Sequence, residues 1–135
     1  MKKRIYLAGA MSGLKWSEMF DWRNTIRCSE LYNDFIIINP CIMYPEVITE
    51  EVEKESMLWD LYQVRQTDIL VVDFSHPNSI GTTWELAIAS EKHIPIIGVY
   101  TSGKSDIHPW WRMTASHICN DIEELIDYIS TYYGE

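Results

Sequence analysis

The fold is decided by one stretch of the sequence, Asp68-Ile-Leu-Val-Val-Asp-Phe-Ser-His-Pro-Asn-Ser-Ile-Gly-Thr-Thr-Trp-Glu-Leu-Ala-Ile-Ala89. Residues 69–74 form a short apolar run rich in β-branched residues, which predicts a strand buried on both faces. Residues 76–81 are dense in turn formers, and a helical pattern follows from Thr82. Ligands of α/β folds bind beyond the carboxyl ends of such strands, against helix N-termini. Glu85, expected in the first turn of this helix, is therefore a candidate functional carboxylate.

The rest of the chain alternates strands with helices. Apolar runs predict strands at 4–8, 35–38, 69–74, 94–100 and 116–119, and helical periodicity predicts helices at 17–33, 50–67, 82–91 and 121–132. Residues 41–48 and 101–111 are expected to be loops. This pattern predicts an α/β fold, with a doubly wound, mostly parallel sheet of about five strands in a flavodoxin-like or Rossmann-like topology. No repeat or linker divides the chain, so a single domain is expected over residues 1–135.

Composition limits the partners and the compartment. The 135 residues carry a net charge of −9, which argues against nucleic acid as the main partner. The apolar run near the N-terminus is short and predicts a first strand rather than a signal peptide, and no run is long enough to span a membrane. The cysteines are three in number and far apart, without metal-ligand spacing. We therefore expect free thiols, no metal site and a cytoplasmic protein.

A small-residue loop follows the first predicted strand. It comprises Gly9, Ala10, Met11, Ser12 and Gly13, at the position where nucleotide-binding folds place their phosphate loop. The loop matches neither of the two common glycine-rich phosphate motifs. It is equally consistent with a tight turn that uses glycine for a positive φ.

Two carboxylates stand out, and each has an ordinary structural explanation. Asp60 is a helical aspartate, usually a solvated charge, but it lies beside the expected buried stripe of Met57, Leu61 and Val64. Glu85 fits a capping box with Thr82, in which its side chain would only accept the backbone N–H of residue 82. Its place after a buried strand and its aromatic neighbours favour a functional role instead.

These residues resemble the nucleoside 2-deoxyribosyltransferase family, which includes the related 2'-deoxynucleoside 5'-monophosphate N-glycosidases. The resemblance covers residues 4–118. It rests on Ile5-Tyr-Leu-Ala-Gly9, on Asp60 eight residues before Asp68-Ile-Leu-Val-Val72, and on Ser79-x-Gly-x-x-x-Glu85-Leu-x-x-Ala89. The last element is the most specific of the three.

The resemblance implies an enzyme that needs neither a metal nor an organic cofactor. Glu85 matches the family nucleophile, Tyr6 the tyrosine that holds it, and Asp60 the acid that acts on the base. A carboxylate suits this chemistry because cleavage of an N-glycosidic bond builds positive charge on the sugar. A second carboxyl with a raised pKa can protonate the leaving base. Water or another base would then release the sugar, as in a retaining glycosidase.

The differences from the family bear on the substrate, a nucleoside or nucleotide. Many transferases have Asp where this chain has Ser79, whereas the monophosphate-cleaving branch has Ser, so the Ser79 hydroxyl and the Gly81 N–H are expected phosphate donors. That branch also usually has Ser and Arg where this chain has Ala10 and Ser12. The family further borrows a residue from a neighbouring subunit, which by position is Ser116 or His117. Together with the surplus of tryptophans, this predicts a homodimer or higher homo-oligomer.

Four functions therefore stay open. The favoured one is cleavage of a (deoxy)nucleoside 5'-monophosphate or a nucleoside through a covalent glycosyl-Glu85 intermediate that water releases. The second is a nucleoside 2-deoxyribosyltransferase that exchanges bases. The third is a TIR-like NAD glycohydrolase, which has a similar fold and also uses a glutamate. The fourth is a nucleotide-sensing module without catalysis, which would have no need of Tyr6, Asp60 and Glu85 together.

Overall fold

A five-stranded, entirely parallel sheet forms the centre of the protein, in the order β2-β1-β3-β4-β5. The computed structural model describes residues 1–134, so Glu135, the last residue of the predicted domain, lies outside the described part. The strands are β1 (Lys3–Ala8), β2 (Phe35–Ile38), β3 (Ile69–Asp73), β4 (Ile96–Val99) and β5 (His117–Cys119). The helices are α1 (Trp16–Arg27), α2 (Leu31–Asp34), the 3-10 helix η1 (Pro40–Met43), α3 (Glu50–Gln66), α4 (Ile80–Glu91), α5 (Pro109–Thr114) and α6 (Ile122–Tyr133).

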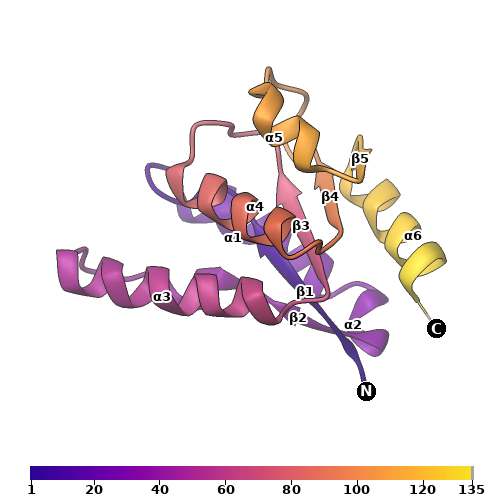
Figure 1. Ribbon diagram of the computed structural model, residues 1–135, viewed down its shortest axis with the longest axis horizontal. Helices are drawn as coiled ribbons and strands as arrows, with labels where there is room; N and C mark the ends of the chain where they lie inside the picture. Colours follow the sequence, from indigo (N-terminus) through magenta and orange to yellow (C-terminus); the bar gives the residue numbers. More distant parts are fainter. Residues whose placement is uncertain (135) are drawn as a thin grey trace.

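This topology confirms the predicted α/β fold with its sheet of five strands. The strand order is the flavodoxin-like one, in which the chain runs outward from β1 to β2 and then crosses back to β3. A crevice opens at the carboxyl ends of β1 and β3, where the two crossovers leave in opposite directions. Figure 1 shows α3 and α4 side by side on one face of the sheet, with α1 and α6 covering the other.

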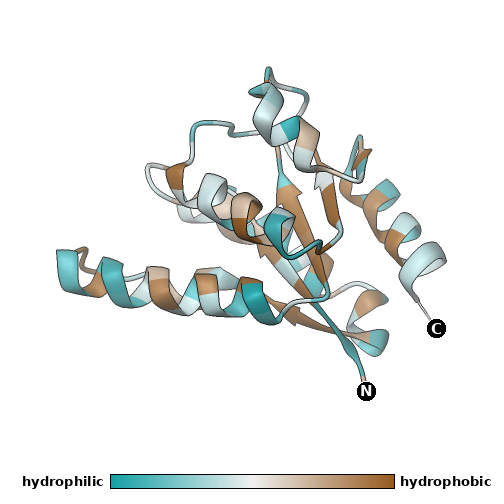
Figure 2. Cartoon of the chain, viewed as in Figure 1, coloured by the Kyte–Doolittle hydropathy of each residue, from teal (hydrophilic) through white to brown (hydrophobic). Residues whose placement is uncertain are grey.

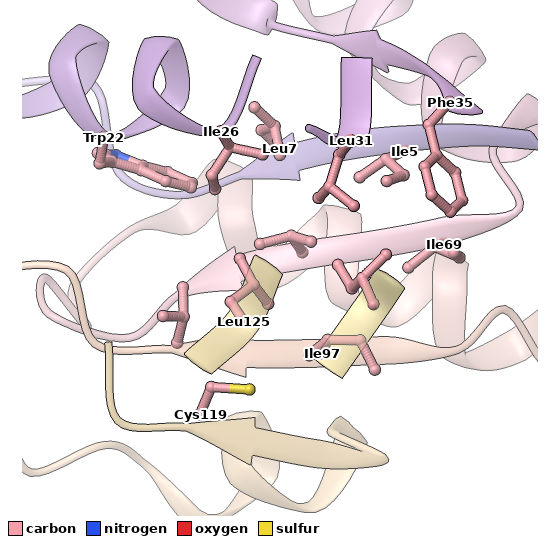
Figure 3. Packing of buried hydrophobic residues seen from close by; sticks show 13 residues of the cluster. Ile5, Leu7, Trp22, Ile26, Leu31, Phe35, Ile69, Ile97, Cys119 and Leu125 are labelled. Atoms are coloured by element: carbon pink, nitrogen blue, oxygen red, sulfur yellow. The ribbon is translucent and has the colours of Figure 1, made fainter. Parts of the chain in front are cut away.

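Side chains of β1 alternate between two hydrophobic clusters because successive residues of a strand point to opposite faces. Ile5 and Leu7 pack with α1 and α6, whereas Tyr6 and Ala8 face α3 and α4. Figure 2 shows the strands as the most hydrophobic part of the chain, and Figure 3 shows Trp22, Ile26 and Leu125 packed over Ile5, Leu7 and Ile97. Every residue of β3 is buried, as the β-branched run predicts for a central parallel strand.

Two predicted boundaries are wrong. The helix expected over 17–33 ends at Arg27, and the Ser29 hydroxyl then donates to the carbonyl of Ile26 and accepts the N–H of Leu31, which starts the separate helix α2. The loop expected over 101–111 gives way to helix α5 at Pro109. At the first helical position a backbone N–H has no partner within the helix, so proline, which lacks an N–H, loses no hydrogen bond there. The His108 side chain caps the helix by accepting the N–H of Trp110.

Helix α3 matches its predicted span but not its predicted buried stripe. Leu61 and Val64 are buried, whereas Met57 is 44% exposed. The N-terminal half of α3 extends beyond the sheet (Figure 1), so its apolar side chains have no strand beneath them. None of the helices in residues 1–134 combines the length and the apolar character that crossing a membrane requires.

Candidate active site

A cavity of about 670 Å³ opens at the carboxyl ends of β1, β2 and β3. Its walls come from the loop after β1, the segment after β2, helix α3 and the start of α4. Eight of the predicted site residues line it: Gly9, Ala10, Met11, Ser12, Asp60, Ser79, Gly81 and Glu85. Much of the remaining wall is apolar, with Met43, Ile48, Met57 and Trp84. The cavity thus occupies the crevice where flavodoxin-like folds bind ligands.

Glu85 is not a capping residue. Helix α4 begins at Ile80, and its N-cap is Ser79, whose hydroxyl oxygen accepts the N–H of Thr82 at 3.2 Å. Glu85 therefore lies in the second turn rather than the predicted first turn. Its side chain is 6% exposed, and its Oε2 atom accepts a short hydrogen bond from the Tyr6 hydroxyl. The capping-box alternative is wrong, and Glu85 and Tyr6 form a buried pair across β1 and α4.

Asp60 projects from α3 into the same cavity. Its Oδ1 atom is buried and has no hydrogen-bond partner among residues 1–134. A buried carboxylate oxygen that accepts no hydrogen bond costs free energy, which a donor on a bound ligand would recover. This atom is therefore available to bind a ligand. Burial raises the pKa of Asp60 to about 7, against a smaller lowering by the positive charge of Arg23. The alternative of a solvated helical charge does not fit this environment.

The two carboxyl groups are electrostatically coupled. The pKa of Glu85 is raised to about 8, chiefly by burial; the Tyr6 hydrogen bond opposes this rise, the charge of Asp60 adds to it, and Arg23 lowers it. Burial and the neighbouring carboxylates also raise the pKa of Tyr6 well above its usual value, which keeps its hydroxyl a donor. Because the protons belong to the pair rather than to one residue, a singly protonated state exists near neutral pH.

Arg23 is a buried part of this site that the sequence prediction missed. Its side chain is 0% exposed and lies beneath the loop after β1. The guanidinium donates to the carbonyl oxygens of Leu7 at 3.0 Å, Gly9 at 3.0 Å and Met19 at 2.6 Å. Helical spacing could have revealed it, because Arg23 shares the buried face of α1 with Met19 and Ile26.

The two glycines of the loop after β1 have different roles. A Cβ atom on Gly9 would lie 3.1 Å from the Trp22 ring, 3.2 Å from Asp73 Cβ and 3.3 Å from Arg23 Nη2, so close packing favours glycine. Gly13, in contrast, has φ +81° and no atom within 4 Å of an added Cβ. The positive φ expected of a tight turn is therefore found at Gly13, which lies outside the cavity lining.

The start of α4 presents Ser79 and Gly81 to the cavity. The Ser79 oxygen accepts hydrogen bonds from Thr82 N and from the Thr82 hydroxyl at 2.8 Å, which leaves its own hydrogen free to donate. An added Cβ on Gly81 would meet nothing within 4 Å, and its φ is not in the positive range. Neither packing nor backbone conformation thus requires glycine there.

Ser116 and His117 lie apart from this cavity. They are at the edge strand β5, where Ser116 N donates to Ile96 O at 2.7 Å. The His117 ring stacks on Tyr128 of α6 with centroids 3.9 Å apart, on the opposite face of the sheet. Since their predicted role concerns a neighbouring subunit, it stays a prediction.

Metal-ligating side chains in the described part of the chain do not gather as they would at a metal centre. Among residues 1–134, no three His, Cys, Asp or Glu side chains form a group that could hold an ion. Cys28, Cys41 and Cys119 are all free thiols.

Solved structures of similar fold were found, although no family model and no curated protein sequence matches this chain. A 2-deoxyribosyltransferase from Bacillus psychrosaccharolyticus superposes with a TM-score of 0.73 at 18% identity, over 93% of this chain and 91% of that one. A conserved protein from Enterococcus faecalis gives 0.76 at 16% identity, over 97% and 99%. A CMP N-glycosidase from Clostridium botulinum gives 0.61 at 15% identity, over 96% and 99%.

The chain has the nucleoside 2-deoxyribosyltransferase-like fold. This confirms the fold that the motifs predicted. At such low identity the likeness concerns the fold, so an argument about activity depends on the cavity and its side chains.

Proposed function

We propose that this protein is an enzyme that cleaves the N-glycosidic bond of a nucleoside 5'-monophosphate or nucleoside. In the first step, a Glu85 carboxylate oxygen attacks the anomeric carbon of the sugar as the bond to the base nitrogen breaks. The bonding electrons leave with the base, and Asp60 transfers its proton to that base. Water then attacks the sugar ester and gives its proton to Asp60, which releases the free sugar and regenerates Glu85.

The observation that carries this proposal is the buried hydrogen bond from Tyr6 to Glu85 in a cavity shared with Asp60. The bond orients the carboxylate and, as a donor, favours its ionised form, which a nucleophile requires. Asp60, with a pKa raised to about 7, is suited to hold a proton near neutral pH and to donate it. With pKa values of about 8 for Glu85 and about 7 for Asp60, the reactive form, in which Glu85 is ionised and Asp60 protonated, is one of the two singly protonated forms of the pair.

A 5'-phosphate is supported by the start of α4. Ser79 has a free hydroxyl hydrogen, and the first N–H groups of this helix carry partial positive charge. The fold shared with a CMP N-glycosidase agrees with a monophosphate substrate. Ala10 and Ser12, where the monophosphate-cleaving branch usually has Ser and Arg, supply fewer donors from the loop after β1.

Base exchange is the second candidate. The 2-deoxyribosyltransferase superposes with a higher TM-score than the N-glycosidase, 0.73 against 0.61. The two reactions share the glycosyl-Glu85 intermediate and differ in whether water or a second base attacks it.

One assay separates the candidates. The protein is incubated with deoxynucleosides, deoxynucleoside monophosphates, ribonucleotides and NAD, with and without an added base, and free base is measured by chromatography. Base release from monophosphates without an acceptor supports hydrolysis, and turnover only with an added base supports exchange. Cleavage of NAD alone would point to a glycohydrolase. Nucleotide binding without any base release would contradict the enzyme proposal.

We also propose a homo-oligomer. Ile80 and Trp84 on α4 and Trp110 and Met113 on α5 are exposed, at 81%, 53%, 79% and 79%. Helices α4 and α5 contact one another, so exposed apolar side chains lie on two neighbouring helices, and Ile80 and Trp84 also line the cavity. Light scattering with Trp110→Glu as a disrupting variant tests the assembly, and a monodisperse monomer would contradict it. The free thiols agree with a cytoplasmic location, which fractionation of cells tests.

A further inference from the structure

Arg23 carries a positive charge into the interior without a direct carboxylate partner. All of the acceptors bonded to its guanidinium are neutral: the carbonyls of Leu7, Gly9 and Met19, and the Cys41 sulfur at 3.5 Å. The Trp22 ring adds a cation–π contact at 4.6 Å. Burying an ion is costly unless an opposite charge compensates it, so a fully buried arginine with neutral contacts needs a further explanation.

The titratable groups near Arg23 come from five elements. They are Tyr6 of β1, Cys41 of η1, Asp60 of α3, Asp73 of β3 and Glu85 of α4. Asp73 is already satisfied, because its oxygens accept from Ser75 N at 2.9 Å, Thr101 N at 3.3 Å and the Thr101 hydroxyl at 2.8 Å. Asp60 has an unsatisfied buried oxygen, and Glu85 accepts only from a neutral hydroxyl. The negative charge that lacks compensation is therefore on the cavity side.

We propose that Arg23 is a positioning residue that provides the fixed counter-charge for the Asp60–Glu85 pair and anchors the Gly9 turn beneath the cavity. Its hydrogen bonds to Leu7 O and Gly9 O hold the end of β1 and the following turn, while its charge acts through space. Any effect of Arg23 on catalysis rests on the proposed function, whereas its effect on the ionisation of Asp60 and Glu85 does not.

The counter-charge decides how many protons the pair holds. Burial alone favours two neutral carboxyl groups, and that state has no nucleophile. A nearby buried cation stabilises the singly ionised state of the pair, in which one carboxyl group is a carboxylate and the other keeps its proton. Consistent with this, the charge of Arg23 lowers the pKa of both Asp60 and Glu85 against the effect of burial.

Two substitutions separate the charge from the hydrogen bonds. Arg23→Lys and Arg23→Gln both lose the guanidinium fork, but only lysine retains a positive charge. Arg27→Gln is the matched control, one turn later on the same helix and exposed. Folding of each variant is verified by circular dichroism and thermal unfolding, and both Arg23 variants are expected to unfold at lower temperatures than the wild type.

Ionisation is measured without any substrate, by carbon-13 NMR of the carboxyl groups as a function of pH. Asp60→Asn and Glu85→Gln assign the signals. Arg23→Gln should raise the proton affinity of the pair about tenfold or more, which corresponds to one pH unit. Arg23→Lys and Arg27→Gln should change it less than about threefold. A folded Arg23→Gln protein that titrates like the wild type would overturn the proposal.

A second measurement needs no change at Arg23 and covers the case in which Arg23→Gln does not fold. In the wild type, the Nε–H signal of Arg23 should move with the same midpoints as the carboxyl pair. The movement should disappear in the Asp60→Asn, Glu85→Gln double variant, and an unmoved signal in the wild type would overturn the proposal. If base release is also observed, its acidic limb should move to higher pH in Arg23→Gln but not in Arg27→Gln. Absence of base release would count against the proposed function alone.

Discussion

The two faces of the sheet use the same strands but have different contents. Beneath α1 and α6, the face that we call closed carries a cluster of buried aliphatic and aromatic side chains, which includes Ile5, Leu7, Leu125 and Ile129. On the other face, α3 and α4 leave a cavity over the sheet edge, and Tyr6 extends from β1 to reach Glu85. Ile5 and Leu7 thus pack on one face of the sheet, whereas Tyr6 between them faces the proposed site on the other.

This difference shows how one strand can supply both stability and a reactive site. A strand directs alternate side chains to opposite faces, so a polar group on one face need not disturb the packing on the other. The closed face should therefore determine stability and the open face activity. Substitutions on the two faces test this separation.

The largest effect on activity is expected for Glu85→Gln. The amide keeps the shape of the side chain but cannot act as a nucleophile, so base release should fall by at least about 10³-fold. The rate is measured under saturating substrate, with Glu91→Gln, an exposed site on the same helix, as the control. Retention of more than a tenth of the activity would exclude Glu85 as the nucleophile.

The same variant should be more stable than the wild type at alkaline pH. Burial raises the pKa of Glu85 to about 8, so the folded state binds a proton more tightly than the unfolded state. This contribution is fully present below the unfolded pKa and is lost as the pH rises through about 8. Glutamine cannot ionise, so Glu85→Gln should gain on the order of 1 kcal/mol or more at pH 9 and nothing at pH 4. Denaturant unfolding at the two pH values measures the difference.

A smaller loss is expected for Asp60→Asn. Removal of the acid should slow base release about 10²-fold, because the leaving base no longer receives its proton. A nucleotide with an N7-methylated purine leaves without that proton, so its cleavage should be nearly unaffected. Glu55→Gln, at an exposed residue of the same helix outside the cavity lining, is the control. Equal losses on both substrates would contradict the assignment of Asp60 as the acid.

Tyr6→Phe should reduce activity about tenfold, the effect of one hydrogen bond to a charged group. The wild-type rate should be bell-shaped in pH with a maximum between about 7 and about 8, since Glu85 must be ionised and Asp60 protonated. The Tyr6 hydrogen bond lowers the pKa of Glu85, so its removal should move the alkaline limb, which follows the higher of the two pKa values, to higher pH. A tenfold loss without that movement would show that Tyr6 acts by packing alone.

The smallest effect on activity is expected on the closed face. Leu125 is 0% exposed, and Leu125→Ala should cost about 2–5 kcal/mol of stability through lost burial and a cavity. The folded fraction should retain its kcat and KM, as measured well below the unfolding temperature. A changed KM at full folding would show that the two faces are coupled.

Much of the fold was predictable because its signals are local. The buried run of β3 and the alternation of strands and helices define a parallel sheet before any contact is known. The interruption at Ser29 was missed because it depends on local hydrogen bonds within an otherwise continuous helical pattern. The short helix α5 was missed because a proline and one capping hydrogen bond start it within a stretch expected to be a loop.

The site was predictable to a different degree. The motifs selected Tyr6, Asp60 and Glu85. The structure brings Asp60 and Glu85 to one cavity and bonds Tyr6 to Glu85, while their roles stay predictions. The buried position of Arg23 was missed, because a charged residue in a helix is usually assigned to solvent. Its environment arises from β1, η1 and α1 together, and a helical pattern read alone does not contain it.

The crowding around Gly9 has a consequence for protein engineering. Trp22 and Arg23 of α1 and Asp73 of β3 close around this position, so a larger residue there would demand simultaneous changes in several others. A mutant library aimed at new base preferences should therefore leave Gly9 fixed and vary the flexible methionines Met11, Met43 and Met57 of the cavity wall. Single substitutions at these methionines could then change selectivity, whereas a single substitution at Gly9 would disturb the packing around it.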